Sequence, residues 1–323
     1  MKAVRVARPG DSSVLEVVDL PMPEPRPAEV VVRIEVAGVN FLDIQTRLDR
    51  YPGGTTFPHI AGREGAGRIV GVGADVEGHS VGDRVALSAV PGCYAEAVAA
   101  PTARVLKLPE AIDAQTAAAS LVQAMSAYVF THETYAVQPG DWVLVHAAAG
   151  GTGRMIVQAA KMEGATVVAT VSSAAKARIA SEAGADHVIR YTETDFAEAC
   201  RAISDFPGFA AIYDSVGPTV PEGLPLLRRR GILVSMGKSG GPIPPLDMDE
   251  LNRLGSLYVT RPNAMHYTEA RADLERIAAA TFDAIASGHM RVLIGRTFPL
   301  EGAAEAQDLL ASRESVGKIL LLP

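Results

Sequence analysis

The stretch HAAAGGTG, residues 146–153, decides the fold, and it follows directly on the apolar run DWVLV at 141–145. A strand followed by a loop almost free of side chains allows two interpretations. Either a helix packs tightly against the strand, or a phosphate group lies against bare backbone. The next residues, GTGRMIVQAAKMEGA at 151–165, carry apolar side chains at helical spacing and reach Gly164, a typical helix C-terminus. The loop therefore joins a strand to a helix.

The same alternation continues after the loop. A second strand, TVVATV at 166–171, is followed by a helix, SAAKARIASEAGA at 173–185, with Ser172 or Ser173 as its N-cap. Further strands are expected at HVIR (187–190), FAAIYDSV (209–216), GILVSMG (231–237) and GSLYVTR (255–261), with helices at 195–203 and 220–229. Strands without a polar face that alternate with helices predict a doubly wound parallel sheet, here over residues 122–262.

The sequence before this segment predicts mostly strands. EVVVRIEVAGV (29–39), GRIVGVG (67–73) and GDRVALSAV (82–90) are expected strands, so residues 1–121 should form a small, partly closed barrel. The tail contains a helix at 270–288 and a final strand at 317–323. We expect this tail, residues 263–323, to rejoin the first domain.

Composition limits the function classes. A chain of 323 residues is long for one core, which favours two domains, and a net charge of −7 argues against a nucleic-acid surface. No run of 18 apolar residues suggests a membrane span, and the start, MKAVRVARPG, lacks a signal-peptide core. The two cysteines, Cys93 and Cys200, have neither metal nor disulfide spacing. We expect a cytoplasmic, metal-free protein.

The setting of the glycine loop favours a dinucleotide. Ligands of parallel sheets bind at the carboxyl ends of the strands, and a helix N-terminus there presents free N–H groups to a pyrophosphate. Gly150, Gly151 and Gly153 leave that approach open, although Ala148 replaces the first glycine of the usual fingerprint. Tight packing alone is the alternative.

The end of the second strand favours NADPH over NADH. NAD enzymes usually place an acidic residue there for the ribose hydroxyls, but VVATVSSAAK (167–176) contains none. It offers Ser172, Ser173 and Lys176, followed by Arg178, and a hydroxyl with a cation suits a 2′-phosphate. The alternative is that Ser172 only caps the helix and Lys176 is solvated.

Several longer motifs resemble the zinc-independent quinone oxidoreductases of the medium-chain dehydrogenase/reductase superfamily. They are AGVNFLDIQTR (37–47), YPGGTTFPHIAGREGAGRIVGVG (51–73), LVQAMSAYVF (121–130), VLVHAAAGGTGRMIVQAAKMEGA (143–165) and SRESVGKILLLP (312–323). The resemblance implies an α/β fold with a GroES-like β-barrel domain (1–121 and 263–323) and a Rossmann domain (122–262). It also implies NADPH as cofactor and a homodimer.

The resemblance assigns candidate site residues. Asn40 would lie beside the nicotinamide and the substrate, and Tyr51 would be a pocket aromatic. The cofactor-binding candidates are Ser126 near the nicotinamide, Gly150, Gly151, Thr152 and Gly153 at the pyrophosphate, Ser172, Lys176 and Tyr191 at the adenosine ribose and 2′-phosphate, and Ser215, Met236, Gly237 and Ser239 along the cofactor. The alternatives are a turn amide for Asn40, packing for Tyr51, a helix-surface serine for Ser126 and an edge residue for Tyr191. The role of Lys318 stays open, and a solvated lysine is as good an interpretation.

Departures from the superfamily bear on metal and substrate. Zinc-dependent relatives have a cysteine ligand at the position of Asn40 and a histidine ligand at the position of Arg63, and their four-cysteine lobe cannot be built here. Gln45 stands where a tyrosine of the substrate pocket is common in the quinone reductases. The resemblance therefore implies a metal-free enzyme whose acceptor stays open.

Three functions remain. Metal-free hydride or electron transfer from NADPH to a quinone-like acceptor needs little more than positioning, because the charge of the product spreads over the ring. An enoyl or enone reductase is the second, with Tyr51 as its proton donor. A non-catalytic NADPH-binding protein is the third, and an RNA-binding role finds no support, since RRR at 228–230 is interpreted as a helix-end run.

Overall fold

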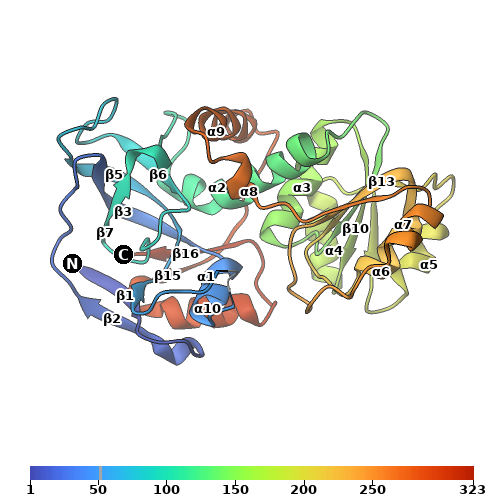
Figure 1. Ribbon diagram of the computed structural model, residues 1–323, viewed down its shortest axis with the longest axis horizontal. Helices are drawn as coiled ribbons and strands as arrows, with labels where there is room; N and C mark the ends of the chain where they lie inside the picture. Colours follow the sequence, from blue (N-terminus) through green and yellow to red (C-terminus); the bar gives the residue numbers. More distant parts are fainter. Residues whose placement is uncertain (51–52) are drawn as a thin grey trace. The chain divides into compact units, whose positions relative to one another are not determined.

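The computed structural model describes residues 1–50 and 53–323, and its contacts divide them into two compact units. The first unit is Met1–Val122 with Val292–Pro323, and the second is Gln123–Arg291 (Figure 1). The candidate Tyr51 lies outside the described residues. Each unit has its own sheet system and core, and each is described by itself.

The first unit is built from antiparallel strands. A three-stranded sheet has the order β2–β1–β4, and a seven-stranded sheet runs β15–β16–β3–β5–β6–β8 with β7 also paired to β3. Among the strands of this unit that the structure describes, β15 and β16 are the one parallel pair. Because the C-terminal β16 pairs with β3, both ends of the chain complete this GroES-like domain. The strands are β1 Lys2–Val6, β2 Leu15–Asp19, β3 Glu29–Val39, β4 His59–Ile60, β5 Glu64–Val72, β6 Arg84–Ser88, β7 Ala97–Pro101, β8 Val105–Lys107, β15 Ile294–Pro299 and β16 Lys318–Leu322.

Among the described residues, three helices and three 3₁₀ turns accompany the strands of this unit. α1 (Phe41–Arg47) follows β3 directly, α2 (Ala114–Tyr128) leads toward the second unit, and α10 (Ala303–Ala311) precedes β16. Three 3₁₀ turns complete it: η1 Ser12–Val14, η2 Thr102–Arg104 and η5 Leu300–Gly302. Valines of β3 alternate toward a core that also contains Ile69, Leu87 and Leu321, all of them buried. This packing fixes the end of β3, where Asn40 begins α1.

The second unit is a parallel sheet, as the unbroken apolar strands predict. Its order is β11–β10–β9–β12–β13–β14, with every neighbouring pair parallel. The order reverses at β9, which is the point where ligands of such sheets bind. The strands are β9 Trp142–His146, β10 Thr166–Val171, β11 His187–Arg190, β12 Phe209–Asp214, β13 Leu227–Ser235 and β14 Tyr258–Thr260.

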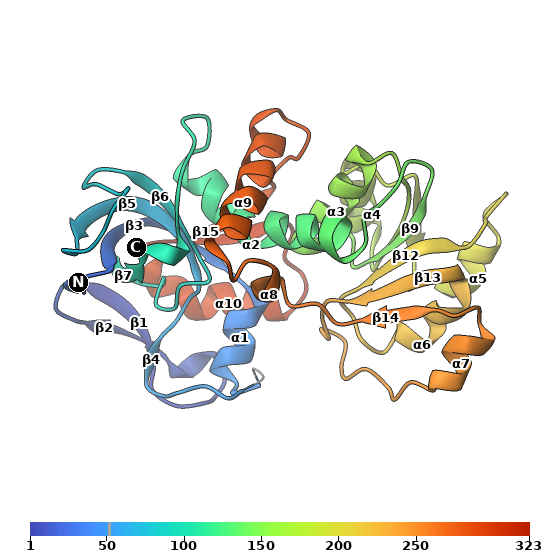
Figure 2. The same cartoon turned by 45° about the horizontal axis from the view of Figure 1, so that its top comes forward.

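Helices cover both faces of this sheet, giving the Rossmann architecture. α3 and α4 lie on one face, and α6 and α7 lie on the other (Figure 2). The helices are α3 Gly151–Met162, α4 Ala174–Glu182, α5 Phe196–Arg201, α6 Val220–Gly223, α7 Met248–Arg253, α8 Ala264–Tyr267 and α9 Arg271–Ala286, with a π-helical turn η3 at Val129–Thr134 and a 3₁₀ turn η4 at Leu224–Leu226. The predicted fold class is thereby confirmed.

Two predictions from the sequence were wrong in detail. The helix expected over 220–229 ends early, because α6 and η4 are short and β13 already begins at Leu227. The basic run 228–230 therefore lies in a strand and not at a helix end. Arg228 pairs with Asp141 at 2.9 Å, and Arg230 adopts a positive φ of 61°, so the run forms the irregular start of β13.

The tail helix groups with the second unit. Arg276 of α9 pairs with Glu133 at 2.7 Å, and Tyr267 of α8 accepts a bond from Thr134 at 3.4 Å. We predicted that residues 263–323 belong with the barrel, whereas the contacts place the return of the chain between Arg291 and Val292. The domain limits themselves stay a prediction.

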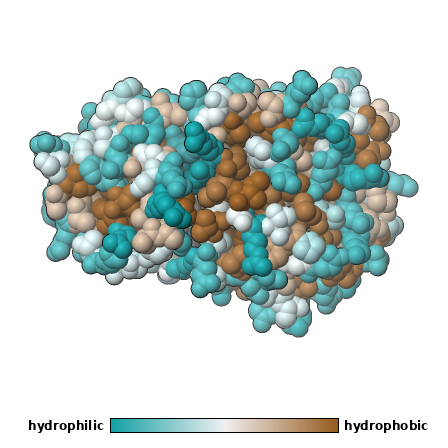
Figure 3. All heavy atoms as spheres, turned by 180° about the vertical axis from the view of Figure 1, so that it is seen from behind, coloured by the Kyte–Doolittle hydropathy of each residue, from teal (hydrophilic) through white to brown (hydrophobic). Residues whose placement is uncertain are grey.

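Hydrophilic residues cover much of the face drawn in Figure 3, and hydrophobic residues lie among these hydrophilic ones. Within residues 1–50 and 53–323, no helix is long and apolar enough to cross a membrane.

Candidate functional site

The glycine loop connects β9 to α3 as the sequence predicts. Gly150 is the N-cap of α3 and has no side chain to accept a hydrogen bond from the first turn. The amides of Gly151, Thr152 and Gly153 therefore have no partner inside the helix, as at any helix N-terminus. Gly150 and Gly151 are exposed. The loop thus offers a row of backbone donors and the positive end of a helix dipole to an anion.

Glycine is present at the three positions of the loop for different structural reasons. A Cβ on Gly153 would lie 2.4 Å from the carbonyl oxygen of Ala147, so this glycine allows the helix to pack against the strand end. A Cβ on Gly151 would meet only the side chain of Gln123, at 3.1 Å, and one on Gly150 would lie 3.2 Å from the Ala147 oxygen. Packing therefore explains Gly153, while backbone access for a phosphate at Gly151 stays a prediction.

The residues proposed for the 2′-phosphate come together at the ends of β10 and β11. Ser173 caps α4 by accepting from the backbone N–H of Lys176 at 3.3 Å, so the cap is Ser173 and Ser172 is left beside it. The backbone N–H of Tyr191 donates to Val171 O at 3.1 Å, and Thr192 Oγ1 donates to Ser172 O at 3.2 Å. Tyr191 is half exposed. The edge contains hydroxyls and a lysine, and its strand end has no carboxylate.

The other cofactor candidates lie at the ends of β12 and β13. Ser239 donates through both its backbone N–H and its hydroxyl to Ser215 O, each at 3.0 Å. Met236 N–H donates to Asp214 O at 2.7 Å, and a Cβ on Gly237 would lie 2.8 Å from Ser215 O. These segments therefore touch backbone to backbone. Ser126, in α2, is half-buried.

Sequence reasoning missed two buried polar residues beneath this edge. Asp214 is fully buried and accepts from Val216 N–H at 2.7 Å and Gly217 N–H at 2.8 Å, which holds the loop after β12. His146 ends β9, and its Nδ1 lies 2.8 Å from Thr170 Oγ1. Burial lowers the pKa of His146, so its imidazole is neutral. Its contact with Thr170 links the ends of β9 and β10.

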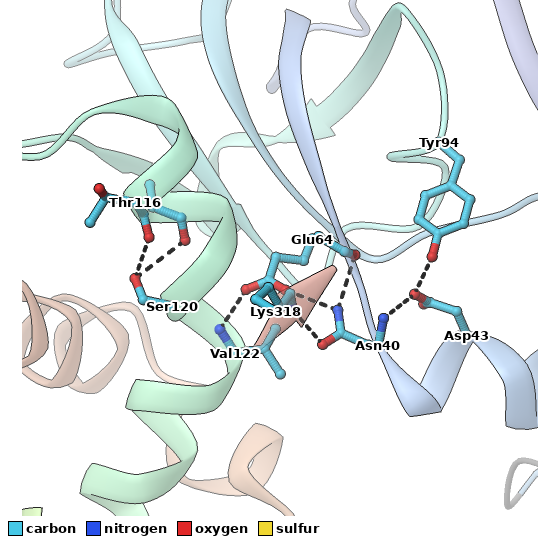
Figure 4. Close-up of polar contacts among 10 residues, drawn as sticks. Asn40, Asp43, Glu64, Tyr94, Thr116, Ser120, Val122 and Lys318 are labelled. Atoms are coloured by element: carbon cyan, nitrogen blue, oxygen red, sulfur yellow. Dashed lines mark hydrogen bonds and ion pairs between the residues drawn. The ribbon is translucent and has the colours of Figure 1, made fainter. Parts of the chain in front are cut away.

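In the first unit, Asn40 belongs to a buried polar network (Figure 4). Its Nδ2 donates to Glu64 Oε2 at 2.9 Å and to Gly38 O at 3.3 Å, and its Oδ1 accepts from Lys318 Nζ at 2.8 Å. Lys318 and Glu64 form an ion pair of 2.6 Å with side chains 4% and 0% exposed. Lys318 is therefore not a solvated lysine, and Asn40 is more than a turn amide.

The network continues into α1 and the barrel. The backbone N–H of Asn40 donates to Asp43 Oδ2 at 2.9 Å, and Tyr94 Oη donates to the same oxygen at 2.8 Å. Burial raises the pKa of Asp43 to about 6, against the hydrogen bonds from Asn40 and Tyr94. Burial also raises the pKa of Tyr94 and that of Cys93. The side chains beneath Asn40 are therefore strongly desolvated.

A glycine makes room for the network. A Cβ on Gly38 would lie 2.5 Å from Glu64 Oε2, 2.9 Å from Lys318 Cε and 2.4 Å from the carbonyl oxygen of Ala118. Gly38 belongs to the motif AGVNFLDIQTR, whose sequence alone does not reveal this crowding. A glycine two residues before a polar N-cap was the only local signal of a crowded site.

The remaining predicted positions lie around α1. Gln45 is half-buried on α1, and Arg63, just before β5, is half-buried as well. Among the residues that the structure describes, no group of three or more His, Cys, Asp or Glu side chains is arranged to hold a metal ion.

Comparison with known proteins defines the class. Residues 26–110 match the family model described as alcohol dehydrogenase GroES-like domain, and residues 151–279 match the one described as zinc-binding dehydrogenase. The two models together define a medium-chain dehydrogenase/reductase, in keeping with the barrel and the Rossmann sheet.

Comparison with individual relatives identifies the family within this class. Quinone oxidoreductase of Pseudomonas aeruginosa is 37% identical, covering 100% of this chain and 99% of its own. The crystal structure of Escherichia coli quinone oxidoreductase complexed with NADPH has a TM-score of 0.96 at 35% identity, with both chains covered fully. 2-Haloacrylate reductase of a Burkholderia species is 36% identical over 93% of this chain and 92% of its own. The chain belongs to the quinone oxidoreductase family of the medium-chain dehydrogenases/reductases.

Proposed function

We propose that this protein is an NADPH-dependent quinone oxidoreductase that reduces a quinone-like acceptor without a metal ion. The observation that carries the proposal is the exposed N-terminus of α3 at the switch point of the sheet, with its unblocked amides at Gly151 and Thr152. NADPH, which is bound by the E. coli relative, supplies the hydride or electrons when it is bound.

The residues present fit this cofactor. Gly150 and Gly151 are exposed and carry no side chain, which leaves their backbone open to a pyrophosphate. Ser172, Lys176 and Tyr191 would hold the 2′-phosphate and the adenosine ribose. Ser126, Gly150, Thr152, Gly153, Ser215, Met236, Gly237 and Ser239 would complete the cofactor site.

Asn40 would bind the acceptor. Its Nδ2–H toward Gly38 O makes a long bond of 3.3 Å, and an acceptor oxygen can replace it at little cost. Reduction of a quinone puts negative charge on oxygen, where a hydrogen bond from an amide stabilises it and water delivers the proton. Tyr51 is proposed as a second pocket residue on sequence grounds alone.

The test is an acceptor panel, with NADPH loss followed at 340 nm. We expect quinones to be reduced, NADPH to be preferred to NADH, and Asn40→Ala to lower kcat about tenfold or more, as for a lost transition-state donor. Asn263→Ala, at an exposed asparagine, is the matched control. Tight NADPH binding with no turnover of any acceptor would instead indicate a non-catalytic NADPH-binding protein.

A second candidate is an NADPH-dependent reductase of a conjugated carbon–carbon double bond. The likeness to 2-haloacrylate reductase favours it, because that protein's name describes an unsaturated acid as substrate. Faster turnover of 2-haloacrylates or enones than of quinones in the same panel would select this function.

We also propose a homodimer. β14 is the outer strand of the parallel sheet, and Tyr258 on it is 54% exposed, so its outer edge can pair with a second copy. Light scattering should give twice the 33.9 kDa chain mass. A Val259→Pro substitution on β14 should produce monomers. A monomeric wild-type protein at micromolar concentration would contradict the dimer.

A further inference from the structure

We infer that Glu64 and Lys318 are positioning residues, whose buried ion pair fixes the orientation of the Asn40 carboxamide. For its catalytic consequence, this inference rests on the proposed function. For the orientation itself, it rests only on contacts within the first unit. From the sequence, the role of Lys318 stayed open and Glu64 was not a candidate.

The charges of the pair distinguish the two ends of the amide. Lys318 Nζ lies 2.8 Å from Asn40 Oδ1, and Glu64 Oε2 lies 2.9 Å from Asn40 Nδ2. An ammonium can only donate and a carboxylate can only accept. Turning the amide by half a turn would set two donors against each other and two acceptors against each other. Since the oxygen and nitrogen of an amide are similar in size, the charges are what select one orientation.

The ion pair is itself held rigidly. Glu64 Oε1 accepts from the backbone N–H of Val122 in α2 at 2.7 Å, while Oε2 accepts from both Lys318 and Asn40 (Figure 4). One carboxylate therefore connects α2, β16 and the start of α1. Both charged side chains are buried, so water does not screen their interaction with the amide.

The fixed orientation matters for the proposed reaction. With Nδ2 held on one side, its second N–H, whose bond to Gly38 O is long with 3.3 Å between Nδ2 and the oxygen, would exchange that bond for one to an acceptor oxygen. The reversed amide would present Oδ1 there and would repel a developing oxyanion. An amide that rotates freely would spend part of its time in the wrong orientation, which lowers kcat more than it changes substrate binding.

The first measurement needs no activity. The chain contains three asparagines, Asn40, Asn252 and Asn263, so selective 15N-asparagine labelling gives three side-chain NH2 pairs. Asn40→Asp assigns one of them, and the exposed Asn252 and Asn263 are internal controls. We expect the Asn40 protons of the wild-type protein to exchange with solvent at least a hundredfold more slowly than those of both controls. Exchange at the rate of the controls would overturn the inference.

The second measurement separates positioning from folding. Lys318→Met/Glu64→Gln removes both charges together, so no buried ion is left without a partner, but the amide orientation is no longer dictated. We expect a folded protein with unchanged NADPH affinity, kcat lowered at least tenfold and KM changed less than threefold. The control, Lys161→Met/Asp186→Asn, removes a partly exposed pair of 2.8 Å in the second unit and should keep kcat. A double variant with wild-type kcat would overturn the inference.

The two proposals fail in different ways. If the wild-type protein reduces no quinone, the proposed function fails, and slow exchange at Asn40 still supports the fixed orientation. If quinones are reduced but Asn40 is unprotected, or the uncharged double variant is fully active, the positioning role fails alone. A double variant that does not fold leaves the exchange measurement on the wild-type protein to decide.

Discussion

Tyr94 donates a hydrogen bond of 2.8 Å to Asp43, a fully buried carboxylate whose other oxygen, Oδ1, has no hydrogen-bond partner among the described residues. Two donors on one oxygen do not compensate for the loss of water around the charge. Burial therefore raises the pKa of Asp43 from 3.8 to about 6, and the ionised form is a cost to the folded state.

This relationship predicts how stability depends on pH. A carboxyl whose pKa is raised in the folded state favours folding while it is protonated, so its contribution is lost as pH rises from about 4 to about 6. The difference between 3.8 and about 6 corresponds to about 3 kcal/mol. In Asp43→Asn, urea unfolding should show a free energy of unfolding that declines less over this range. Asp205→Asn, at an exposed carboxylate, should behave like the wild type, and identical slopes in all three proteins would contradict the prediction.

Substitutions in the glycine loop should lower stability at Gly153 and NADPH affinity at Gly151. Gly153→Ala would place a Cβ 2.4 Å from backbone, so α3 must move and the free energy of unfolding should fall by about 1–3 kcal/mol. Gly151→Ala meets only the Gln123 side chain, so its melting temperature should stay near that of the wild type while NADPH affinity falls about tenfold or more. Calorimetry of unfolding and of NADPH binding measures both. Equal losses of affinity and stability in both variants would refute the division of roles.

These examples show what the sequence can and cannot predict. The parallel sheet and the glycine loop followed from local patterns, because each strand is an apolar run and each helix has its own caps. The partners of Asn40 could not be predicted from local patterns. Lys318 is 278 residues away in the sequence, and the pairing of β16 with β3 brings it next to Asn40. The interpretation of the run 228–230 as a helix end was wrong. In the sequence, basic residues at an exposed start of a strand cannot be distinguished from basic residues at the end of a helix.

Lys176 should distinguish the two nicotinamide cofactors. It lies in the first turn of α4, whose cap is Ser173, directly after the end of β10, where residues 171–176 contain no carboxylate. Lys176→Ala should weaken NADPH binding about 10- to 150-fold, which corresponds to a charge-assisted contact of about 1.5–3 kcal/mol, and should leave NADH nearly unchanged. Arg253→Ala, with a side chain 70% exposed and paired with Glu250 on α7, is the control. Equal loss of both cofactors would show that Lys176 does not bind the 2′-phosphate.

Activity should be unaffected by metal chelation. The resemblance to zinc-dependent relatives implies that Asn40 and the cationic Arg63 stand at former ligand positions, and the Asn40 amide is already bonded to Glu64 and Lys318. Protein treated with EDTA and dialysed should retain its quinone turnover, and plasma mass spectrometry should find less than a tenth of an equivalent of zinc. One tightly bound zinc per chain, with activity lost on its removal, would disprove the metal-free mechanism.

The choice of acceptor is tested at Tyr51, which is a candidate from the sequence. Reduction of an enoyl thioester needs a placed proton donor, because the enolate must be protonated on carbon, where proton transfer is slow. Reduction of a quinone leaves the charge on oxygen, which water protonates at once. If quinones are the acceptors, Tyr51→Phe should keep most of its turnover, since the loss is one hydrogen bond of about 0.5–1.5 kcal/mol.

The opposite result would change the substrate class. A loss of about a hundredfold or more in kcat is typical of a removed general acid. Combined with good wild-type turnover of a conjugated alkene, that loss would identify Tyr51 as the proton donor of an enoyl or enone reductase. Asn40→Ala then provides the complementary comparison, because an amide donor to oxygen assists both reactions whereas a tyrosine acid assists only protonation at carbon. Comparable losses of quinone turnover in both variants would contradict our proposal that Asn40 stabilises the reduced quinone while Tyr51 contributes only packing and one hydrogen bond.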